Sequence, residues 1–158
     1  MANHRATPVA ITHQVRDACL CLHVQRAARA LSRRFDCAFR PIGITGGQFS
    51  LMMSLNRQTP ARIAAVAALL AMDRTTLTAN LKPLERRGLL SIAVDAEDRR
   101  SRTLALTPKG HQLLAAAVPI WKRTHAEIER RIDSSDPDRL RVDLRALALS
   151  ELKETNHD

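Results

Sequence analysis

Apolar residues recur at the spacing of an α-helix along the first forty residues, with polar and basic positions between them. The apolar stripe consists of Leu20, Val24, Ala27, Leu31, Phe35 and Phe39. Pro41 and Gly43 follow the stripe, and both residue types end helices. The spacing therefore predicts one long helix over residues 10–39.

Two further helices are signalled by the residues that precede them. Thr45, followed three residues later by Gln48, has the form of a capping box and predicts a helix through Leu55. Thr59 precedes Pro60, which we expect to be the first residue of a short helix.

The next segment carries a complete set of helix signals. Asp73 is suited to accept hydrogen bonds from the free N–H groups of a first turn, and Gly88 tolerates the left-handed position beyond a last turn. Between them Leu77, Leu81 and Leu84 form a single apolar stripe. We therefore expect an amphipathic helix over 74–87 that faces the core with its leucines.

A change of period marks a short β-hairpin and the return to helix. Leu89–Val94 and Arg102–Leu106 read as strands around a polar tip, and Thr107 with Pro108 starts another helix. Its apolar face is formed by Leu113, Leu114, Ala117, Ile120, Trp121, Ile128 and Ile132. Residues 134–137 break that helix, and the last helix carries Leu140, Leu144, Leu147 and Leu152.

This order of elements predicts a mostly α-helical fold with a small β-hairpin. Residues 41–110 form a winged helix-turn-helix, and residues 1–40 and 111–158 form a helical region outside it. The apolar stripes of the outer helices need a partner surface, and a two-fold homodimer supplies one. We therefore expect these terminal helices to dimerise the protein.

Charge indicates an acidic partner. The chain has 158 residues and a formal net charge of +9. Residues 1–110 hold 17 Lys and Arg against 7 Asp and Glu, whereas residues 111–158 hold 8 against 9. Because the excess lies with the predicted winged domain, double-stranded DNA is the expected partner.

The predicted helix over 74–87 and the hairpin tip carry the side chains suited to DNA. A polar helix face without carboxylates fits a phosphate-lined major groove, and an arginine-rich tip fits a minor groove. The expected DNA-binding residues are Arg74, Thr75, Thr76, Thr78, Asn80, Lys82, Arg86, Asp98, Arg99, Arg100 and Arg102.

Four motifs between Asp73 and Gly110 resemble the MarR family of transcriptional regulators. They are Asp73-Arg-Thr-Thr-Leu, Leu84-Glu-Arg-Arg-Gly-Leu, Asp98-Arg-Arg and Leu106-Thr-Pro-Lys-Gly. The resemblance implies a homodimeric repressor that binds operator DNA and is released by small, often phenolic or aromatic, anions. It also implies that Arg100 enters the minor groove and that Asp98 braces the wing. A solvated tip, in which Asp95, Glu97 and Asp98 pair with the wing arginines, is the alternative.

A ligand pocket and a redox site are further hypotheses. The candidates for contact with a small-molecule effector are His23, Arg26, Arg29, Arg33 and Met52, where an arginine suits a carboxylate. The same arginines also suit a solvated or phosphate-facing row. Leu20-Cys21-Leu22-His23 resembles the peroxide sensors of the family, so an alternative function is thiol-redox sensing through Cys21. Those sensors rely on tyrosine hydroxyls, however, and this chain has no tyrosine. A nucleoid-style DNA binder without a ligand is a third hypothesis.

Other classes lack positive signals. There is no phosphate-cradling glycine loop and no metal-ligand spacing, so we predict no enzyme activity, cofactor or metal. The first residues lack a hydrophobic targeting core, and the three cysteines are an odd number, which indicates a cytoplasmic protein without a membrane partner.

Overall fold

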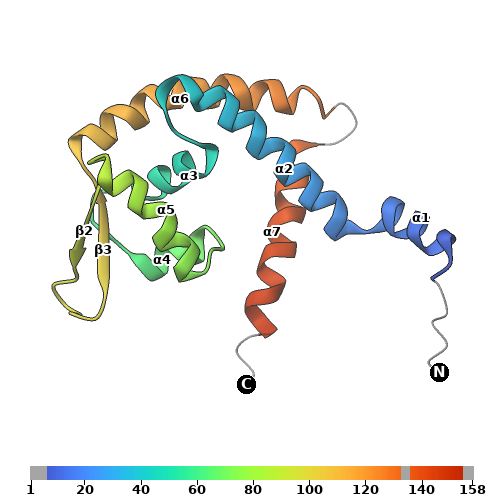
Figure 1. The fold of residues 1–158 in the computed structure, drawn as a ribbon, viewed down its shortest axis with the longest axis horizontal. Helices are drawn as coiled ribbons and strands as arrows, with labels where there is room; N and C mark the ends of the chain where they lie inside the picture. The colour runs from blue at the N-terminus through green and yellow to red at the C-terminus, as the bar shows by residue number, and fades with distance from the viewer. Residues whose placement is uncertain (1–6, 133–135, 155–158) are drawn as a thin grey trace.

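The computed structural model describes residues 7–132 and 136–154, with side chains as far as residue 148. The helices are α1 (Val9–Ala18), α2 (Leu20–Phe39), the 3-10 helix η1 (Arg40–Ile42), α3 (Gly46–Ser54), α4 (Ile63–Leu69), α5 (Arg74–Arg86), α6 (Pro108–Glu129) and α7 (Pro137–Glu154). The strands are β1 (Ala61–Arg62), β2 (Leu90–Val94) and β3 (Arg102–Leu106). Helices α2 and α6 lie against each other above a winged domain, and α1 projects away from it (Figure 1).

The predicted caps form in the winged domain. Thr45 Oγ1 accepts from the Gln48 backbone N–H, and the Gln48 side chain accepts from the Thr45 N–H, which confirms the capping box. Asp73 caps α5, and Gly88 beyond its end has φ +67°. The predicted leucine stripe of α5 is fully buried, with no side chain more than 1% exposed. The mostly helical winged fold predicted from the sequence is confirmed.

The sheet has three strands, one more than the sequence pattern indicates. Pro60 does not begin a helix: Ala61 and Arg62 form β1, and α4 starts at Ile63. β1 pairs antiparallel with β3, with Ala61 opposite Leu104, and β2 pairs with the other edge of β3. The strand depends on this pairing across 43 positions of sequence, which no local pattern reveals.

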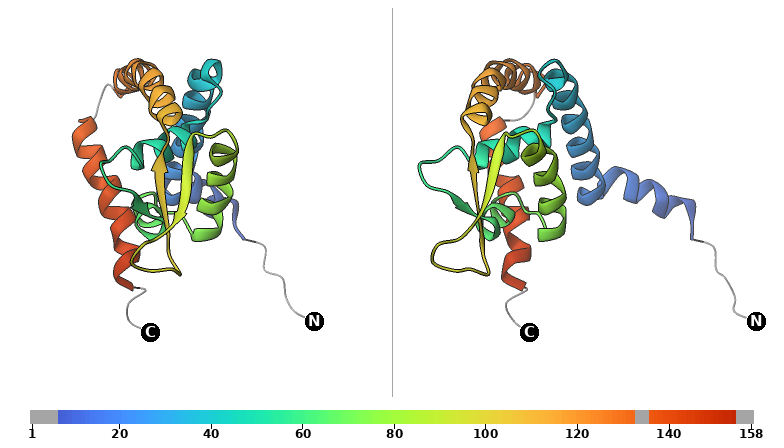
Figure 2. Two further views of the ribbon diagram at one scale, coloured as in Figure 1. Left: turned by 90° about the vertical axis from the view of Figure 1, so that its left-hand side faces the viewer. Right: turned by 60° about the vertical axis from the view of Figure 1, so that its left-hand side comes forward.

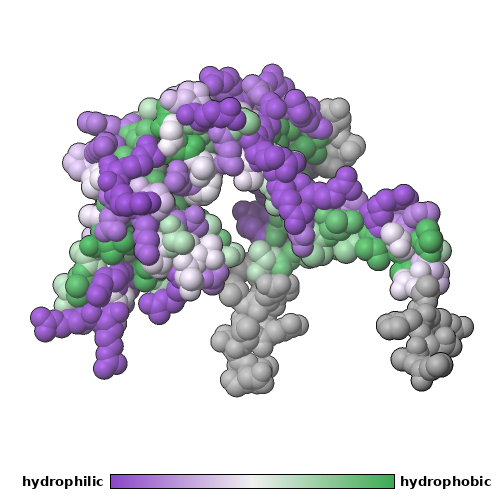
Figure 3. Space-filling view, in the orientation of Figure 1, coloured by the Kyte–Doolittle hydropathy of each residue, from purple (hydrophilic) through white to green (hydrophobic). Residues whose placement is uncertain are grey.

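The predicted helix over 10–39 is two helices, because Cys19 adopts an extended conformation (φ −73°, ψ 107°). If the stripe of α2 were continued backwards at helical spacing, it would meet the polar residues His13, Arg16 and Asp17. A break at Cys19 instead allows the apolar residues of both helices to face one side. Figure 3 shows hydrophobic residues along the lower side of α1 and the start of α2.

Helix α6 ends earlier than its apolar pattern predicts. It runs without interruption through Pro119 but stops at Glu129, so Ile132 lies beyond it. Of the predicted break over 134–137, residues 134 and 135 lie outside the described residues. Helix α7 begins at Pro137, as the proline suggests.

The main core lies where α2, α3 and α6 meet the winged domain. Its largest fully buried side chains include Phe39, Met52, Leu55, Leu84 and Leu104. Phe39 stacks on Phe49 with ring centroids 4.8 Å apart, so the core connects the upper helices to α3. This packing positions the outer face of α5 and the hairpin.

Candidate nucleic-acid interface

Helix α5 turns its polar face to solvent because its leucines are buried on the opposite side. Asp73 accepts from the Thr76 N–H at 2.8 Å and from the Thr76 hydroxyl at 2.6 Å. The Thr76 hydroxyl, followed by backbone N–H groups, holds the pKa of Asp73 below its usual value. The start of the helix is thereby fixed while its outer face stays exposed.

The polar face of α5 divides into side chains that bond to their own helix and side chains that do not. Thr76 bonds to Asp73, Thr78 Oγ1 donates to the Arg74 carbonyl at 2.7 Å, and Asn80 Nδ2 donates to the Thr76 carbonyl at 3.0 Å. The side chains of Arg74, Thr75, Lys82 and Arg86 make no hydrogen bond or ion pair within the described part of the chain.

Four of these residues surround one hollow on the surface of α5. It has a volume of about 350 Å³ and is lined by Arg74, Thr75, Thr78, Ala79 and Lys82. All five side chains are exposed. The hollow therefore presents two cations and two hydroxyls to a partner, with no carboxylate in its lining.

The hairpin tip, which carries three arginines, lies at the same end of the winged domain as the start of α5, as the ribbons show (Figures 1 and 2). Arg99 and Arg100 are exposed, and their guanidinium groups have no partner among the described residues. Arg102 donates to the Arg99 and Ser101 carbonyls. Figure 3 shows hydrophilic side chains projecting from this tip.

The Asp98 side chain accepts a hydrogen bond from the backbone of the tip and, within the described residues, forms no ion pair with a guanidinium. Its Oδ1 accepts from the Arg100 backbone N–H at 2.9 Å, and its carbonyl accepts from the Ser101 N–H at 2.8 Å. Asp98 thus shapes the turn that carries Arg100.

Arg62 of β1 binds two of the three acidic residues that the solvated-tip alternative assigned to the wing arginines. Its Nε donates to Asp95 Oδ2 at 2.7 Å, and its Nη2 donates to Glu97 Oε2 at 2.7 Å. Asp95 is buried and also accepts from the Glu97 backbone N–H at 2.9 Å. Sequence reasoning missed Arg62, because it lay in a segment predicted as helix and 33 positions from its partner.

This anchorage lowers the pKa of Asp95. The largest cause is the hydrogen bond from the Glu97 backbone N–H, and the Arg62 guanidinium adds to it against the opposing effect of burial. A depressed native pKa means that folding favours the ionised carboxylate. Its stabilisation is complete above the unfolded pKa of about 3.9 and is lost as the pH falls through the native value.

We expect Asp95→Asn to lower the melting temperature at neutral pH, because the amide removes the ion pair with Arg62. The gap in melting temperature between wild type and variant should stay constant from pH 6 to about 4 and narrow below the unfolded pKa of about 3.9, where the wild type begins to lose the same charge. Thermal melts across this range measure the gap. A gap that stays constant with pH would show that the charge of Asp95 does not brace the hairpin.

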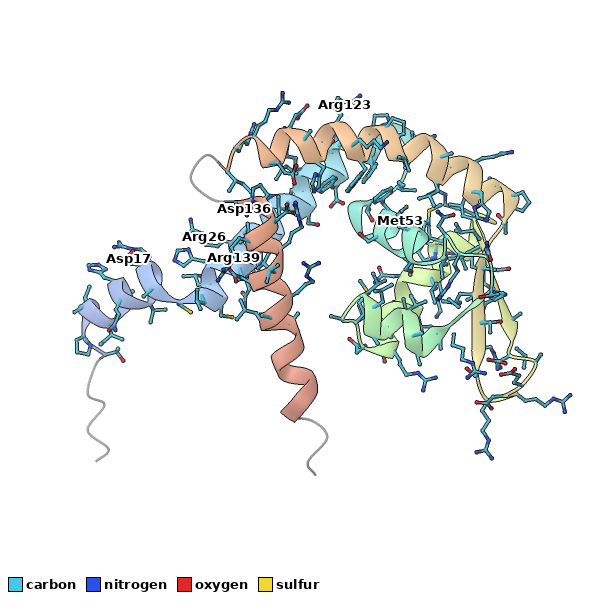
Figure 4. All side chains as sticks on the ribbon, turned by 180° about the vertical axis from the view of Figure 1, so that it is seen from behind. Asp17, Arg26, Met53, Arg123, Asp136 and Arg139 are labelled. Atoms are coloured by element: carbon cyan, nitrogen blue, oxygen red, sulfur yellow. The ribbon has the colours of Figure 1, made fainter. Side chains whose placement is uncertain are left out.

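The residues predicted to contact an effector are not brought together. His23 contacts the Asp17 carbonyl, Arg29 donates to Gln25, and Arg26 is exposed on α2. Figure 4 places Arg26 on α2 near the junction with α1, well away from Met53 on α3. Arg33 lines a hollow formed only by residues of α2 and α6, whereas Met52 is fully buried in the core.

An aromatic cavity lies instead between α2, α3 and α6. Its volume is about 270 Å³, and it is lined by Ala28, Leu31, Ser32, Phe35, Phe39, Gly46, Gly47, Phe49, Ser50 and Trp121. A chain of ring contacts runs along it: Phe35 to Phe39, Phe39 to Phe49 and Phe49 to Trp121. No charged residue lines this cavity.

Cys21 is exposed, and its sulfur accepts from Gln25 Nε2 at 3.1 Å. Cys19 and Cys37 are also free thiols. Across residues 7–132 and 136–154, no cluster of three His, Cys, Asp or Glu is arranged to hold a metal ion. None of the described helices is both long and apolar enough to span a membrane.

Comparisons with known proteins agree with this geometry. Residues 44–110 match the family model of a winged helix DNA-binding domain. The transcriptional regulator HosA of Escherichia coli O157:H7 is 28% identical over 95 residues, which are 60% of this chain and 70% of HosA.

Two solved structures extend the likeness to most of the chain. The M. tuberculosis transcriptional regulator MosR in complex with DNA is 34% identical, with a TM-score of 0.77 over 89% of this chain and 99% of MosR. A mutant MarR from E. coli complexed with operator DNA is 18% identical, with a TM-score of 0.75 over 85% of this chain and 96% of MarR. The second likeness shows the shared fold alone.

Proposed function

We propose that this chain, which belongs to the MarR family of DNA-binding transcriptional regulators, is a homodimeric repressor that a small effector releases from operator DNA. The observation that carries the proposal is the pairing of an uncommitted polar face on α5 with uncommitted arginines at the hairpin tip. MosR, which is similar to this chain, was crystallised in complex with DNA. The proposed arrangement places α5 in a major groove and the hairpin at the neighbouring minor groove.

The residues divide by the part of the DNA they meet. Arg74 and Thr75, at the start of α5, have free donors for base edges or phosphates, and Lys82 and Arg86 reach phosphates. Thr76, Thr78 and Asn80 already donate within the helix and offer remaining acceptor positions. Arg99, Arg100 and Arg102 extend from a tip that Asp98 shapes.

A homodimer is supported by the surface that one chain leaves uncovered. The exposed large apolar residues described on the outer helices are Val9, Ile11, Val15, Leu20, Val24, Leu31, Leu140, Val142, Leu144 and Leu147. A two-fold dimer that buries them sets two α5 helices about 34 Å apart, which fits a near-palindromic site.

The effector is proposed to be a small aromatic molecule held in the aromatic cavity between α2, α3 and α6. The cavity borders both the outer helices and the winged domain through α3. An occupant there contacts both parts, so binding is coupled to their relative position.

Footprinting on the DNA upstream of the protein's own gene tests the function. We expect protection of a short near-palindrome, which aromatic compounds added in a panel reverse. Uniform binding along the fragment would favour a nucleoid-style protein, and a protected site that no aromatic compound affects would reject the effector.

Lys82→Ala tests the phosphate contact. We expect weaker binding to every DNA sequence and a salt dependence of the binding constant that is lower by about one unit of log–log slope, because one released counterion is lost. Titrations at several salt concentrations measure the slope. A slope equal to that of the wild type would remove Lys82 from the contact.

A redox response through Cys21 is the second candidate function, favoured by the exposure of its thiol and the Gln25 donor. Cys21→Ser separates the two candidates. If the thiol is the sensor, peroxide should release wild type from DNA and leave the serine variant bound. If peroxide releases both proteins equally, Cys21 is not the sensor.

A further inference from the structure

Another hollow lies between the winged domain and α6. We call it the Met53 groove: it has a volume of about 430 Å³ and is lined by Phe49, Ser50, Met53, Ser54, Leu69, Leu70, Val118 and Trp121. These residues come from α3, the end of α4 and the middle of α6. Figure 4 shows Met53 on α3, beneath α6.

The groove exposes apolar side chains that a folded domain normally buries. Met53 is 41% exposed and Leu69 is 70% exposed. Phe49, Ser50 and Trp121 line both this groove and the aromatic cavity, so only one layer of side chains separates the two. Its volume exceeds the roughly 150 Å³ of a cavity that binds benzene, which leaves room for a two-ring molecule.

The chemistry of the lining selects an uncharged occupant. No Lys, Arg, His, Asp or Glu lines the groove. A buried carboxylate would lose its hydration without gaining a partner, whereas an apolar ring loses nothing comparable. Ser54 already donates to the Leu51 carbonyl, while the Ser50 hydroxyl and the Trp121 indole N–H have no hydrogen bond in the described part of the chain. These two groups are enough to orient one hydroxyl or carbonyl on the occupant.

The groove ends beside the turn that precedes α5. Leu69 and Leu70 are followed by Ala71, whose φ is +49°, a left-handed conformation that no other non-glycine residue adopts within the described segments. Such a conformation is strained for alanine. Two residues later Asp73 caps α5. A molecule packed against Leu69 and Leu70 therefore presses on the turn that fixes where α5 starts.

We propose that the Met53 groove binds an uncharged hydrophobic aromatic molecule and that binding lowers DNA affinity through the Ala71 turn. The inference rests on the proposed effector response, and it names both the chemical class and a second place of binding. The uncharged ligand proposed here differs from the aromatic anion that the family resemblance implies.

A matched pair of probes tests the class of ligand. 2-Naphthol is uncharged and 2-naphthoate is anionic at neutral pH, and both carry the same rings. The chain has one tryptophan, so the single indole N–H signal in a nitrogen-15 correlation spectrum reports on Trp121 alone. We expect 2-naphthol to shift this signal and to bind at least about tenfold more tightly by calorimetry than 2-naphthoate.

Substitutions locate the site and its coupling. Met53→Arg should tighten 2-naphthoate about tenfold and so remove most of the preference for 2-naphthol, because the guanidinium pairs with the carboxylate. Ala68→Arg, an exposed position of α4 outside the groove, should bind both probes as the wild type does. Ala71→Gly should keep 2-naphthol binding but reduce its effect on DNA affinity, because glycine adopts the left-handed turn without strain.

The outcomes separate this inference from the function it rests on. If the wild type binds no operator, the proposed function fails whatever the probes do. If it binds operator and 2-naphthol neither shifts the Trp121 signal nor weakens DNA binding, the groove proposal fails alone. Equal binding of both probes, or an unchanged preference in Met53→Arg, would also overturn it. So would a Trp121 signal that moves on dilution to monomer and not with probe, since a second copy would then fill the groove.

Discussion

Gly110→Ala should unfold the protein at the base of the hairpin. A Cβ at this position would lie 2.0 Å from the Leu89 carbonyl oxygen and 3.0 Å from its carbon, both backbone atoms. Because the Leu89 carbonyl also accepts from the Thr107 N–H at 3.1 Å, neither side can move without breaking that bond. We expect a loss of about 3 kcal/mol or more in the free energy of unfolding.

Gly47→Ala is the matched control. A Cβ there meets only Thr45 Oγ1, at 3.9 Å, and the residue lies in α3, where alanine is favoured over glycine by about 0.5–1 kcal/mol. Urea denaturation of the two variants measures the contrast. Similar midpoints for Gly110→Ala and wild type would mean that the helix and the hairpin are not in close contact.

Arg100→Ala should weaken operator binding by about 1–3 kcal/mol and reduce the preference for A·T steps next to the major-groove contact. The reason is structural: the acidic residues of the tip bind Arg62 or the backbone, so the Arg100 guanidinium has no described partner to leave. A narrow A·T-rich minor groove attracts such a cation through its enhanced negative potential.

Arg123→Ala provides the control for charge alone. Arg123 is exposed on α6, at the top of Figure 4 and opposite the hairpin tip. The Arg123→Ala substitution removes one positive charge, as Arg100→Ala does, but it lies outside the proposed interface. Operator affinity should therefore change little. Affinities for operators with A·T or G·C flanks, measured for both variants, test the prediction. If the two variants lose affinity equally, Arg100 acts through net charge and not through a groove contact.

The sequence predicts the elements whose signals are local. Caps at Thr45 and Asp73, the terminator Gly88 and the leucines of α5 all lie within a few positions of the structure they specify. The same holds for the two long strands, whose ends are predicted to within one residue. The family motifs add the winged topology.

What the sequence pattern misses depends on distant partners. β1 exists through its pairing with Leu104, and Arg62 finds its role through Asp95, so neither has a signature in its own neighbourhood. The cavities are missed for the same reason: Phe49 and Trp121 lie 72 positions apart and meet only when α3 packs on α6. The arginines predicted to contact an effector are on α2, which does border the aromatic cavity, but none of them lines it.

Helix α6 joins the base of the hairpin to the neighbourhood of α7 as one rigid rod. Its 22 residues span about 33 Å at 1.5 Å per residue. If one end tilts by about 5°, the other end moves by about 3 Å, close to the rise of 3.4 Å between successive base pairs. A tilt of about 5° is thus enough to shift the hairpin by about one base pair. Under the proposed function, the length of α6 would let small changes of angle far from the DNA alter where the hairpin meets it.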